Sequence, residues 1–364
     1  MMKPYHQTEH GTLYLGDARE ALRALPDGSV NCCVTSPPYW GLRDYGVEGQ
    51  LGLERTPDEY VAKMVEVFRE VRRVLRDDGT LWLNLGDSYA TGAGKVGECP
   101  GGGEQGEKWR GYRGTRNGDN KNPEAMGPLV QPNRMPIPGL KPKDLVGIPW
   151  MVAFALRADG WYLRQDIIWH KPNPMPESVR DRCTKAHEYL FLLTKSERYY
   201  CDMEAIQEDS IWKDPRAPYG SEGAWALDGR AADKRNSGKV RKPAAKGSLN
   251  GKTEAMADTG QNAFRSIVDR RNRRTVWSVT TQPFPAAHFA TFPPKLIEPC
   301  ILAGCPSGGT VLDPFMGSGT TAIVAYKHGR KFVGVELSQK YLDEITIPRI
   351  EAETKQMRLF SAAK

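Results

Sequence analysis

The tetrapeptide Ser36-Pro37-Pro38-Tyr39 combines residue types that could hold an amino group on an aromatic ring. The Ser36 hydroxyl and the Pro37 carbonyl are hydrogen-bond acceptors, and Tyr39 offers an aromatic face. Two prolines end a strand abruptly, so the tetrapeptide is expected on a stiff loop after the apolar run at residues 30–35. Acceptors that hold both hydrogens of an amine bias its nitrogen towards tetrahedral geometry and aim its lone pair.

A glycine-rich turn in the C-terminal part has the pattern of a nucleotide-binding loop. Gly317 and Gly319 lie between an apolar strand and a helix, where glycines let the backbone turn tightly and approach a ligand. Glu336 follows 17 residues after Gly319, at the end of the next strand, where a carboxylate suits a ribose diol. Gly317-x-Gly319-x-x-Ala322 also fits the dinucleotide fingerprint, so a nicotinamide-dependent oxidoreductase is one alternative. It would need a substrate acid/base pair, and it leaves residues 36–40 unexplained.

Taken together, the two motifs resemble those of DNA methyltransferases that modify amino groups. Asp313-Pro314-Phe315-Met316-Gly317-Ser318-Gly319-Thr320-Thr321 resembles their cofactor loop, and residues 36–39 resemble their catalytic tetrapeptide. The tetrapeptide precedes the cofactor loop, an order similar to that of the β group, in which the methyltransferase fold is circularly permuted. Other segments also resemble family blocks: Gly16-Asp17, Trp169–Pro176, His187–Lys195 and His288–Pro293. The resemblance covers roughly residues 10–90, 145–205 and 275–350.

This resemblance implies methyl transfer from S-adenosylmethionine to the exocyclic amine of a base flipped out of duplex DNA. The implied catalytic residues are Ser36, Pro37, Pro38 and Tyr39. The first two supply acceptors for the amine hydrogens, and Tyr39 stacks on the base. No covalent enzyme–base intermediate is needed, so the adjacent Cys32 and Cys33 are expected to be ordinary strand residues.

Cofactor contacts also follow from the resemblance. Glu336 is expected to accept from the ribose hydroxyls and Asp17 from the adenine amino group. Phe292 and Pro293 are expected to wall the adenine or the methionine part. The remaining residues line the methionine part: Asp313, Phe315, Gly317, Gly319 and Thr320. Asp17 could instead be the N-cap of a helix that begins at Ala18, and the two phenylalanines could be core aromatics.

The first residue of the tetrapeptide favours one target atom. Ser36 is typical of relatives that methylate N4 of cytosine, whereas adenine-specific relatives usually have Asp or Asn there. Cytosine is also the smaller base, and Trp40 could fill space that a purine would need. Methylation of N6 of adenine is the runner-up. RNA or protein-glutamine methylation usually goes with Asn-Pro-Pro-Tyr, and a non-catalytic DNA-binding module would transfer no methyl group at all.

The basic residues are concentrated in one part of the chain. The net charge is +7, and residues 206–275 hold 15 Lys and Arg against 9 Asp and Glu. A local basic surplus suggests a polyanion partner. We therefore expect residues 206–275 to be the target-recognition region and assign DNA binding to Arg270, Arg271, Arg273 and Arg274. A second irregular segment, residues 90–145 with Lys108, Arg110, Arg113 and Arg116, is expected to clamp DNA.

Around these segments, the chain alternates strand and helix patterns. Strands are expected at 12–16, 30–35, 80–85, 162–170, 187–194, 310–312 and 331–336. Helices are expected at 18–25, 57–76, 149–158, 294–303, 320–328 and 339–347. This pattern predicts an α/β fold, a Rossmann-like methyltransferase domain whose mostly parallel sheet has helices on both faces. Residues 1–205 are expected to form its catalytic part and residues 276–364 its cofactor-binding part.

Composition narrows the protein class. The chain has 364 residues, and it has no apolar run near the roughly 20 residues of a membrane helix. It shows no secretion signal, and its seven cysteines form no CxxC pair, so neither a disulfide framework nor a metal site is expected. We expect a cytoplasmic monomer or homodimer that acts on double-stranded DNA. A cognate restriction endonuclease is a candidate partner.

Overall fold

The computed structural model describes residues 2–42, 46–90, 137–209, 270–282 and 291–362. Most of the 90–145 segment, including its four named basic residues, lies outside these ranges. The same holds for residues 210–269 of the expected recognition region and for His288. The described chain divides into two compact units, residues 1–205 with 274–364 and residues 206–273.

The larger unit is built on a nine-stranded sheet in the order β1-β2-β11-β10-β3-β4-β6-β5-β9. From β2 to β4 the neighbouring strands are parallel, and β6 lies antiparallel to both β4 and β5. The C-terminal strands β10 and β11 therefore lie between two N-terminal strands. The strand bounds are β1 His6–Gln7, β2 Gly11–Leu15, β3 Val30–Thr35, β4 Leu75–Leu85, β5 Tyr162–His170, β6 His187–Thr194, β9 Val276–Ser278, β10 Thr310–Asp313 and β11 Lys331–Glu336.

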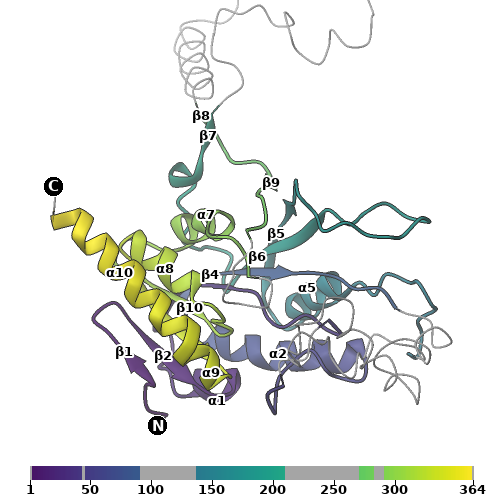
Figure 1. Cartoon of the computed structure of the whole chain (residues 1–364), viewed down its shortest axis with the longest axis horizontal. Helices are drawn as coiled ribbons and strands as arrows, with labels where there is room; N and C mark the ends of the chain where they lie inside the picture. The colour runs from purple at the N-terminus through teal and green to yellow at the C-terminus, as the bar shows by residue number, and fades with distance from the viewer. Residues whose placement is uncertain (1, 43–45, 91–136, 210–269, 283–290, 363–364) are drawn as a thin grey trace, which may run out of the picture. The chain divides into compact units, whose positions relative to one another are not determined.

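Helices cover both faces of this sheet. One group contains α1, α2 and α5, and the other contains α7, α8 and α10 (Figure 1). Their bounds are α1 Ala18–Arg23, α2 Pro57–Val74, α5 Ile148–Ala158, α7 Pro294–Gly304, α8 Thr320–Lys327, α9 Gln339–Tyr341 and α10 Ile347–Ala362. The predicted α/β fold with a mostly parallel, permuted sheet is confirmed.

Strand β4 shows how the sheet binds the two helical layers. Its odd-numbered residues from Leu81 to Leu85 lie in the core that contains α2 and α5. Thr80 and Trp82 point the other way, towards Gly304 at the end of α7. A Cβ atom at Gly304 would come within 2.5 Å of the Thr80 hydroxyl oxygen and of the Trp82 ring nitrogen. Glycine therefore lets α7 approach the sheet closely.

Helix boundaries follow local capping. Helix α2 begins after Thr56, whose hydroxyl accepts from the Glu59 N–H, and Pro57 occupies its first turn. Helix α5 has no side-chain cap of its own. Asp87, from the loop after β4, accepts from the N–H groups of Gly147 and Ile148 instead. The predicted helix at 339–347 is interrupted, because a π-helical turn at Leu342–Thr346 separates α9 from α10.

The 90–145 segment leaves and rejoins the fold at one place. The Ala90 N–H donates to Asp144 O, and the Lys143 N–H donates to Ala90 O. Tyr89 and Leu145 form an antiparallel bridge beside them. The two ends of the insertion are therefore held together where it leaves the fold.

Each helix in the described ranges is too short or too polar to cross a membrane. Cys32 and Cys33 are buried in β3, and burial raises the pKa of both thiols well above the ordinary value. Buried thiols of this kind are poor nucleophiles, as the sequence predicted.

Candidate active site

The motif residues meet at one edge of the sheet. Strands β2, β11, β10 and β3 are parallel neighbours, so their carboxyl ends share an edge. Residues 36–40 follow β3, the glycine-rich loop follows β10, and Glu336 ends β11 beside Leu15 of β2. Ligands of open α/β sheets bind in the crevice outside these carboxyl ends.

Asp313 joins the two loops. Its carboxyl oxygens accept from Thr35 Oγ1 and from Thr321 Oγ1, each at 2.6 Å, and one also accepts from the Phe315 N–H at 3.0 Å. The side chain is buried, and burial raises its pKa to about 6 despite these three donors. The Asp313 carboxyl thus contacts protein groups, and its expected place against the methionine part stays a prediction.

Glu336 holds the glycine turn in place. One carboxyl oxygen accepts from the Gly317 N–H at 2.9 Å, and the other accepts from the Ser338 N–H at 2.9 Å. Burial raises the pKa of Glu336, although these N–H groups oppose the shift. Gly317 and Gly319 have φ values of 50° and 78°, a region that favours glycine, and Gly319 is the N-cap of α8.

The surface around this turn fits S-adenosylmethionine. A Cβ atom at Gly317 would meet nothing closer than Phe315 O, at 3.9 Å, so the backbone there is open to a ligand. The Glu336 carboxylate is partly exposed and keeps lone pairs for a diol, because its two oxygens can accept more bonds than the backbone N–H groups supply. Phe292 and Phe315 are half-buried, and Pro293 is buried at the start of α7. Thr320 is buried, and its hydroxyl accepts from Arg349 at 2.9 Å.

Asp17 lies beside this turn, because the Gly16 N–H donates to Glu336 O. Its carboxylate caps α1 by accepting from the Arg19 and Glu20 N–H groups. It also pairs with the Arg19 side chain at 3.1 Å. Although partial burial opposes it, Arg19 lowers the pKa of the Asp17 carboxyl. The N-cap alternative is therefore observed, and the adenine contact stays a prediction.

The tetrapeptide of residues 36–39 is part of a hydrogen-bond network. Ser36 Oγ donates to the Tyr39 hydroxyl at 3.3 Å. The Tyr39 hydroxyl lies 2.8 Å from Glu188 Oε2 and 3.1 Å from Asn84 Oδ1. Glu188 is in turn paired with Lys171. Burial and the nearby Glu188 raise the pKa of Tyr39 well above its ordinary value, so the hydroxyl remains a donor.

Sequence reasoning missed Glu188, Lys171 and Asn84 as members of the site. Glu188 and Lys171 lie within segments that resemble family blocks, but nothing in the sequence says that they meet. Their meeting follows from the β5–β6 hairpin, in which His170 pairs with His187 and Trp169 with Glu188. The hairpin register could have been proposed from the two strand patterns and would have placed both residues at the end where the strands are connected.

The Tyr39 ring packs against a backbone position without a side chain. A Cβ atom at Gly86 would lie 2.5 Å from Cε2 and 2.9 Å from Cδ2 of Tyr39. Gly86 follows β4, so the strand end itself supports one side of the ring. Glycine is required there by this close approach.

Trp40 does not lie where the sequence argument placed it. Its side chain is 1% exposed, belongs to the hydrophobic core, and donates from Nε1 to Glu54 O at 2.9 Å. An indole buried in this way fills core volume and does not narrow an open base pocket. The expectation that Trp40 excludes a purine is therefore wrong, because the ring packs in the core and is held there by Glu54 O.

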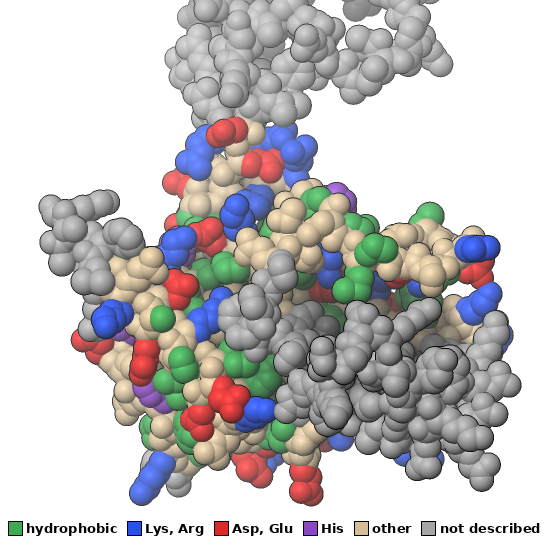
Figure 2. All heavy atoms as spheres, viewed as in Figure 1, with side chains coloured by type: hydrophobic (Ala, Val, Ile, Leu, Met, Phe, Trp, Pro, Cys, Tyr) green, Lys and Arg blue, Asp and Glu red, His purple; other side chains and the backbone are tan. Residues whose placement is uncertain are grey.

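Three of the arginines assigned to DNA, Arg270, Arg271 and Arg273, belong to the smaller unit, and Arg274 belongs to the larger one. Within the smaller unit, β7 (Glu208–Asp209) pairs with β8 (Arg270–Arg271), and Arg271 Nε contacts Glu208 at 2.9 Å. Acidic and basic side chains are intermixed around β7 and β8 (Figure 2). Arg274 is exposed, and Arg273 is partly exposed. Their DNA contacts stay a prediction, and Arg271 already has an acidic partner.

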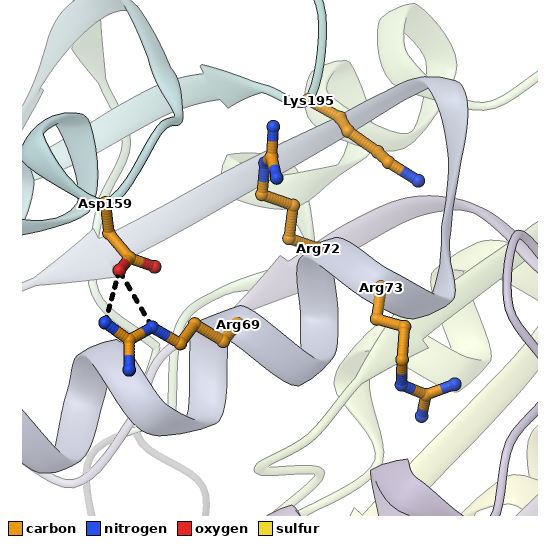
Figure 3. Close-up of a pocket in the computed structure, with 5 residues that line it drawn as sticks. All are labelled: Arg69, Arg72, Arg73, Asp159 and Lys195. Atoms are coloured by element: carbon orange, nitrogen blue, oxygen red, sulfur yellow. Dashed lines mark hydrogen bonds and ion pairs between the residues drawn. The ribbon is translucent and has the colours of Figure 1, made fainter.

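A separate cavity of about 330 Å³ lies away from the motif residues (Figure 3). It is lined by Arg69, Arg72, Arg73, Asp159 and Lys195. Arg73 and Lys195 lie next to the start of β4 and the end of β6, at the sheet edge opposite the carboxyl ends of β3 and β10. Asp159 pairs with Arg69 at 2.6 Å. The cavity takes no part in the arrangement described above.

Comparison with known proteins identifies a family. The sequence model of a family described as DNA methylase, of the N6 and N4 type, matches residues 30–347. The chain is 45% identical to the Type II methyltransferase M.Cfr9I of Citrobacter freundii over 352 residues, which cover 97% of this chain and 91% of that protein. It is 44% identical to the Type II methyltransferase M.SmaI of Serratia marcescens, over 90% of this chain and 87% of that protein.

A solved structure shares the fold. The cytosine-N4-specific PvuII DNA methyltransferase aligns with a TM-score of 0.55 at 17% identity, covering 98% of this chain and 95% of that chain. The family match and these relatives give the dehydrogenase alternative no support. The chain belongs to the family of S-adenosylmethionine-dependent DNA methylases that modify amino groups at N6 of adenine or N4 of cytosine.

Proposed function

We propose that this DNA methyltransferase methylates N4 of a cytosine that is flipped out of duplex DNA. The observation that carries the proposal is the buried bond between Thr35 and Asp313, which fixes the loop of residues 36–39 to the glycine-rich loop. A base held by the first loop would lie next to a methyl donor held by the second. Fixed geometry between two reactants is itself a large part of a rate enhancement.

S-adenosylmethionine supplies an electrophilic methyl group when it is bound. Glu336 would accept from its ribose hydroxyls, and the open backbone at Gly317 would let it approach. Phe315 and Phe292 would pack against it from the loops that follow β10 and precede α7. Asp17, Pro293, Asp313 and Thr320 complete the proposed cofactor residues, of which Asp313 shapes the loop through its buried bonds.

The tetrapeptide would act on the amine. An exocyclic amine is a poor nucleophile because its lone pair is delocalised into the ring. Ser36 Oγ donates its proton to Tyr39, so its lone pairs are available for one amine hydrogen, and the Pro37 carbonyl can take the other. Pro38 stiffens the loop, and the Tyr39 ring, supported by Gly86, can stack on the flipped base.

The choice of cytosine over adenine as the target base rests on one residue. Ser36 opens the tetrapeptide, as in N4-specific relatives, and the buried Trp40 gives no further support. Methylation of N6 of adenine is therefore the second candidate. The deciding experiment is digestion of methylated DNA to nucleosides and their separation by mass spectrometry, which distinguishes N4-methylcytosine from N6-methyladenine.

DNA recognition is proposed for residues 206–275, with phosphate or base contacts from Arg270, Arg271, Arg273 and Arg274. Arginine suits both kinds of contact, because it can hydrogen-bond to guanine edges and neutralise backbone phosphates. The relatives are named Type II methyltransferases, which supports a cognate restriction endonuclease as a partner. An enzyme with this role would work in the cytoplasm as a monomer or homodimer.

A further inference from the structure

The β5–β6 hairpin brings a charged pair to the catalytic loop from a distant part of the sequence. Glu188, at the start of β6, pairs with Lys171, which follows β5. Both side chains are mostly buried, with 16% and 19% exposed, respectively. The Lys171 ammonium also lies 4.4 Å from the centre of the Trp169 ring. Ion pairs held in this way keep one geometry, because both partners have further contacts.

The Glu188 oxygen that does not contact Lys171 faces the tetrapeptide. Glu188 Oε1 contacts Lys171, and Oε2 accepts from the Tyr39 hydroxyl at 2.8 Å. Asn84 Nδ2 donates to the same oxygen at 3.3 Å and to Tyr189 O at 3.0 Å. Asn84 is 2% exposed, so its amide is fixed by the sheet. The Tyr39 hydroxyl therefore meets an oriented carboxylate.

The direction of the bonds has a consequence for Ser36. A hydroxyl whose proton is given to a carboxylate offers its lone pairs to other donors. Tyr39 can therefore accept from Ser36 Oγ, 3.3 Å away, and the Ser36 proton turns away from the substrate side. Ser36 is then left as an acceptor. Chains of this kind also polarise one another.

We propose that Glu188, held by Lys171, is a positioning residue that acts through the Tyr39 hydroxyl to make Ser36 an acceptor for the amine hydrogen. The inference rests on the proposed function, in which Ser36 and Tyr39 contact the base. It gives Tyr39 two separable parts, a ring that stacks and a hydroxyl that orients. It holds for either target base, since both carry an exocyclic amine.

The test is a double-mutant cycle on the full-length enzyme. Glu188→Ala, Tyr39→Phe and the double variant are assayed with radiolabelled S-adenosylmethionine and unmethylated genomic DNA. Each single variant is expected to lower kcat by about 10- to 100-fold, the range for losing a hydrogen bond to a charged group. The KM for DNA and the affinity for S-adenosylmethionine should stay within about twofold. Because the two groups act in one chain, the double variant should be no slower than the slower single variant.

Two further variants separate positioning from folding. Glu177, in the segment that connects β5 and β6, pairs with Arg182 at 2.6 Å. Glu177→Ala removes this acid and should leave kcat unchanged. Glu188→Gln keeps an acceptor oxygen and should recover most of the kcat lost in Glu188→Ala. No recovery would assign the effect to the ion pair alone and overturn the positioning role. Tyr39→Phe leaves the ion pair intact, so its loss of kcat cannot come from an unpaired Lys171.

The inference and the proposed function fail in different ways. Losses that multiply in the double variant, or full activity in Tyr39→Phe, would overturn the role of Glu188 while the wild type still made N4-methylcytosine. A wild type that made only N6-methyladenine would overturn the choice of base, and a coupled double-mutant cycle would still support Glu188.

Discussion

Thr35 Oγ1 donates a 2.6 Å hydrogen bond to Asp313, a residue 278 positions away in the sequence. Both side chains are 1% exposed, and they lie at the carboxyl ends of the neighbouring strands β3 and β10. This bond joins the loop expected to hold the base to the loop expected to hold the methyl donor. It therefore links the two halves of the permuted fold at the site itself.

Asp313 should make stability depend on pH. Its pKa is raised from 3.8 to about 6 in the folded chain, so the native state binds the proton more tightly than the unfolded state. The contribution of the protonated Asp313 to the free energy of unfolding is full below about pH 4 and is lost as pH rises through 6. The free energy of unfolding changes by on the order of 3 kcal/mol over this range. Urea unfolding of the wild type and Asp313→Asn at several pH values measures it. The free energy of unfolding of the wild type minus that of Asp313→Asn should fall from pH 4 to 7. A constant difference would refute the raised pKa of Asp313.

Glu336 should contribute directly to cofactor binding. Glu336→Ala is expected to weaken S-adenosylmethionine binding by about 1–3 kcal/mol, because the ribose hydroxyls lose a charged acceptor. The Gly317 N–H also loses its partner, so the turn should loosen. Calorimetric titration measures the change, with Glu344→Ala as a control at an exposed acid nearby. Equal affinities in both variants would remove Glu336 from the site.

Gly86 should be as important for turnover as a residue that touches the base. In Gly86→Ala the new methyl group would collide with the Tyr39 ring, so the ring must shift. We expect kcat to fall at least about tenfold, since stacking on an aromatic is worth roughly 1–3 kcal/mol per base. Tyr39→Ala should lose most turnover in the same way. In both variants the affinity for S-adenosylmethionine, measured by calorimetry, should be kept. A fully active Gly86→Ala enzyme would show that the ring position does not matter.

DNA affinity should report on the arginines near β8. Replacing Arg270, Arg271, Arg273 and Arg274 by Gln should flatten the dependence of binding on salt, by about 0.9 log units per log unit for each phosphate that is no longer neutralised. Arg271 should contribute least, because it is paired with Glu208. Fluorescence anisotropy at several salt concentrations measures the slope. Arg69→Gln, in the cavity at the opposite sheet edge, is the matched control. If the quadruple variant kept the wild-type slope, the DNA surface would lie elsewhere.

Local patterns were enough to predict much of the fold. The bounds of β3, β5, β6 and β11 agree with the sequence prediction, because each of these segments is rich in apolar and aromatic residues. Strand β9 was not predicted, since three residues with one buried side chain carry no usable period. The π-helical turn before α10 was missed because side-chain periodicity does not report one extra residue in a turn.

The site was predictable only where its residues are neighbours in sequence. The tetrapeptide and the glycine-rich loop are short motifs, so they could be recognised directly. The bonds from Tyr39 to Glu188 and from Thr35 to Asp313 depend on strand order and register, which single motifs do not contain. Trp40 was misplaced for the same reason. Its neighbour Tyr39 lies at the site, but the Trp40 indole packs in the core against residues that the motif does not contain.

The central claim is methyl transfer to N4 of cytosine in duplex DNA. Purified enzyme, S-adenosylmethionine and unmethylated genomic DNA are incubated, and the DNA is digested to nucleosides for mass spectrometry. Ser36 predicts N4-methylcytosine, and its formation should be abolished by Tyr39→Ala. A product that contained only N6-methyladenine would contradict the choice of base, and a digest without any methylated amino group would contradict the account as a whole.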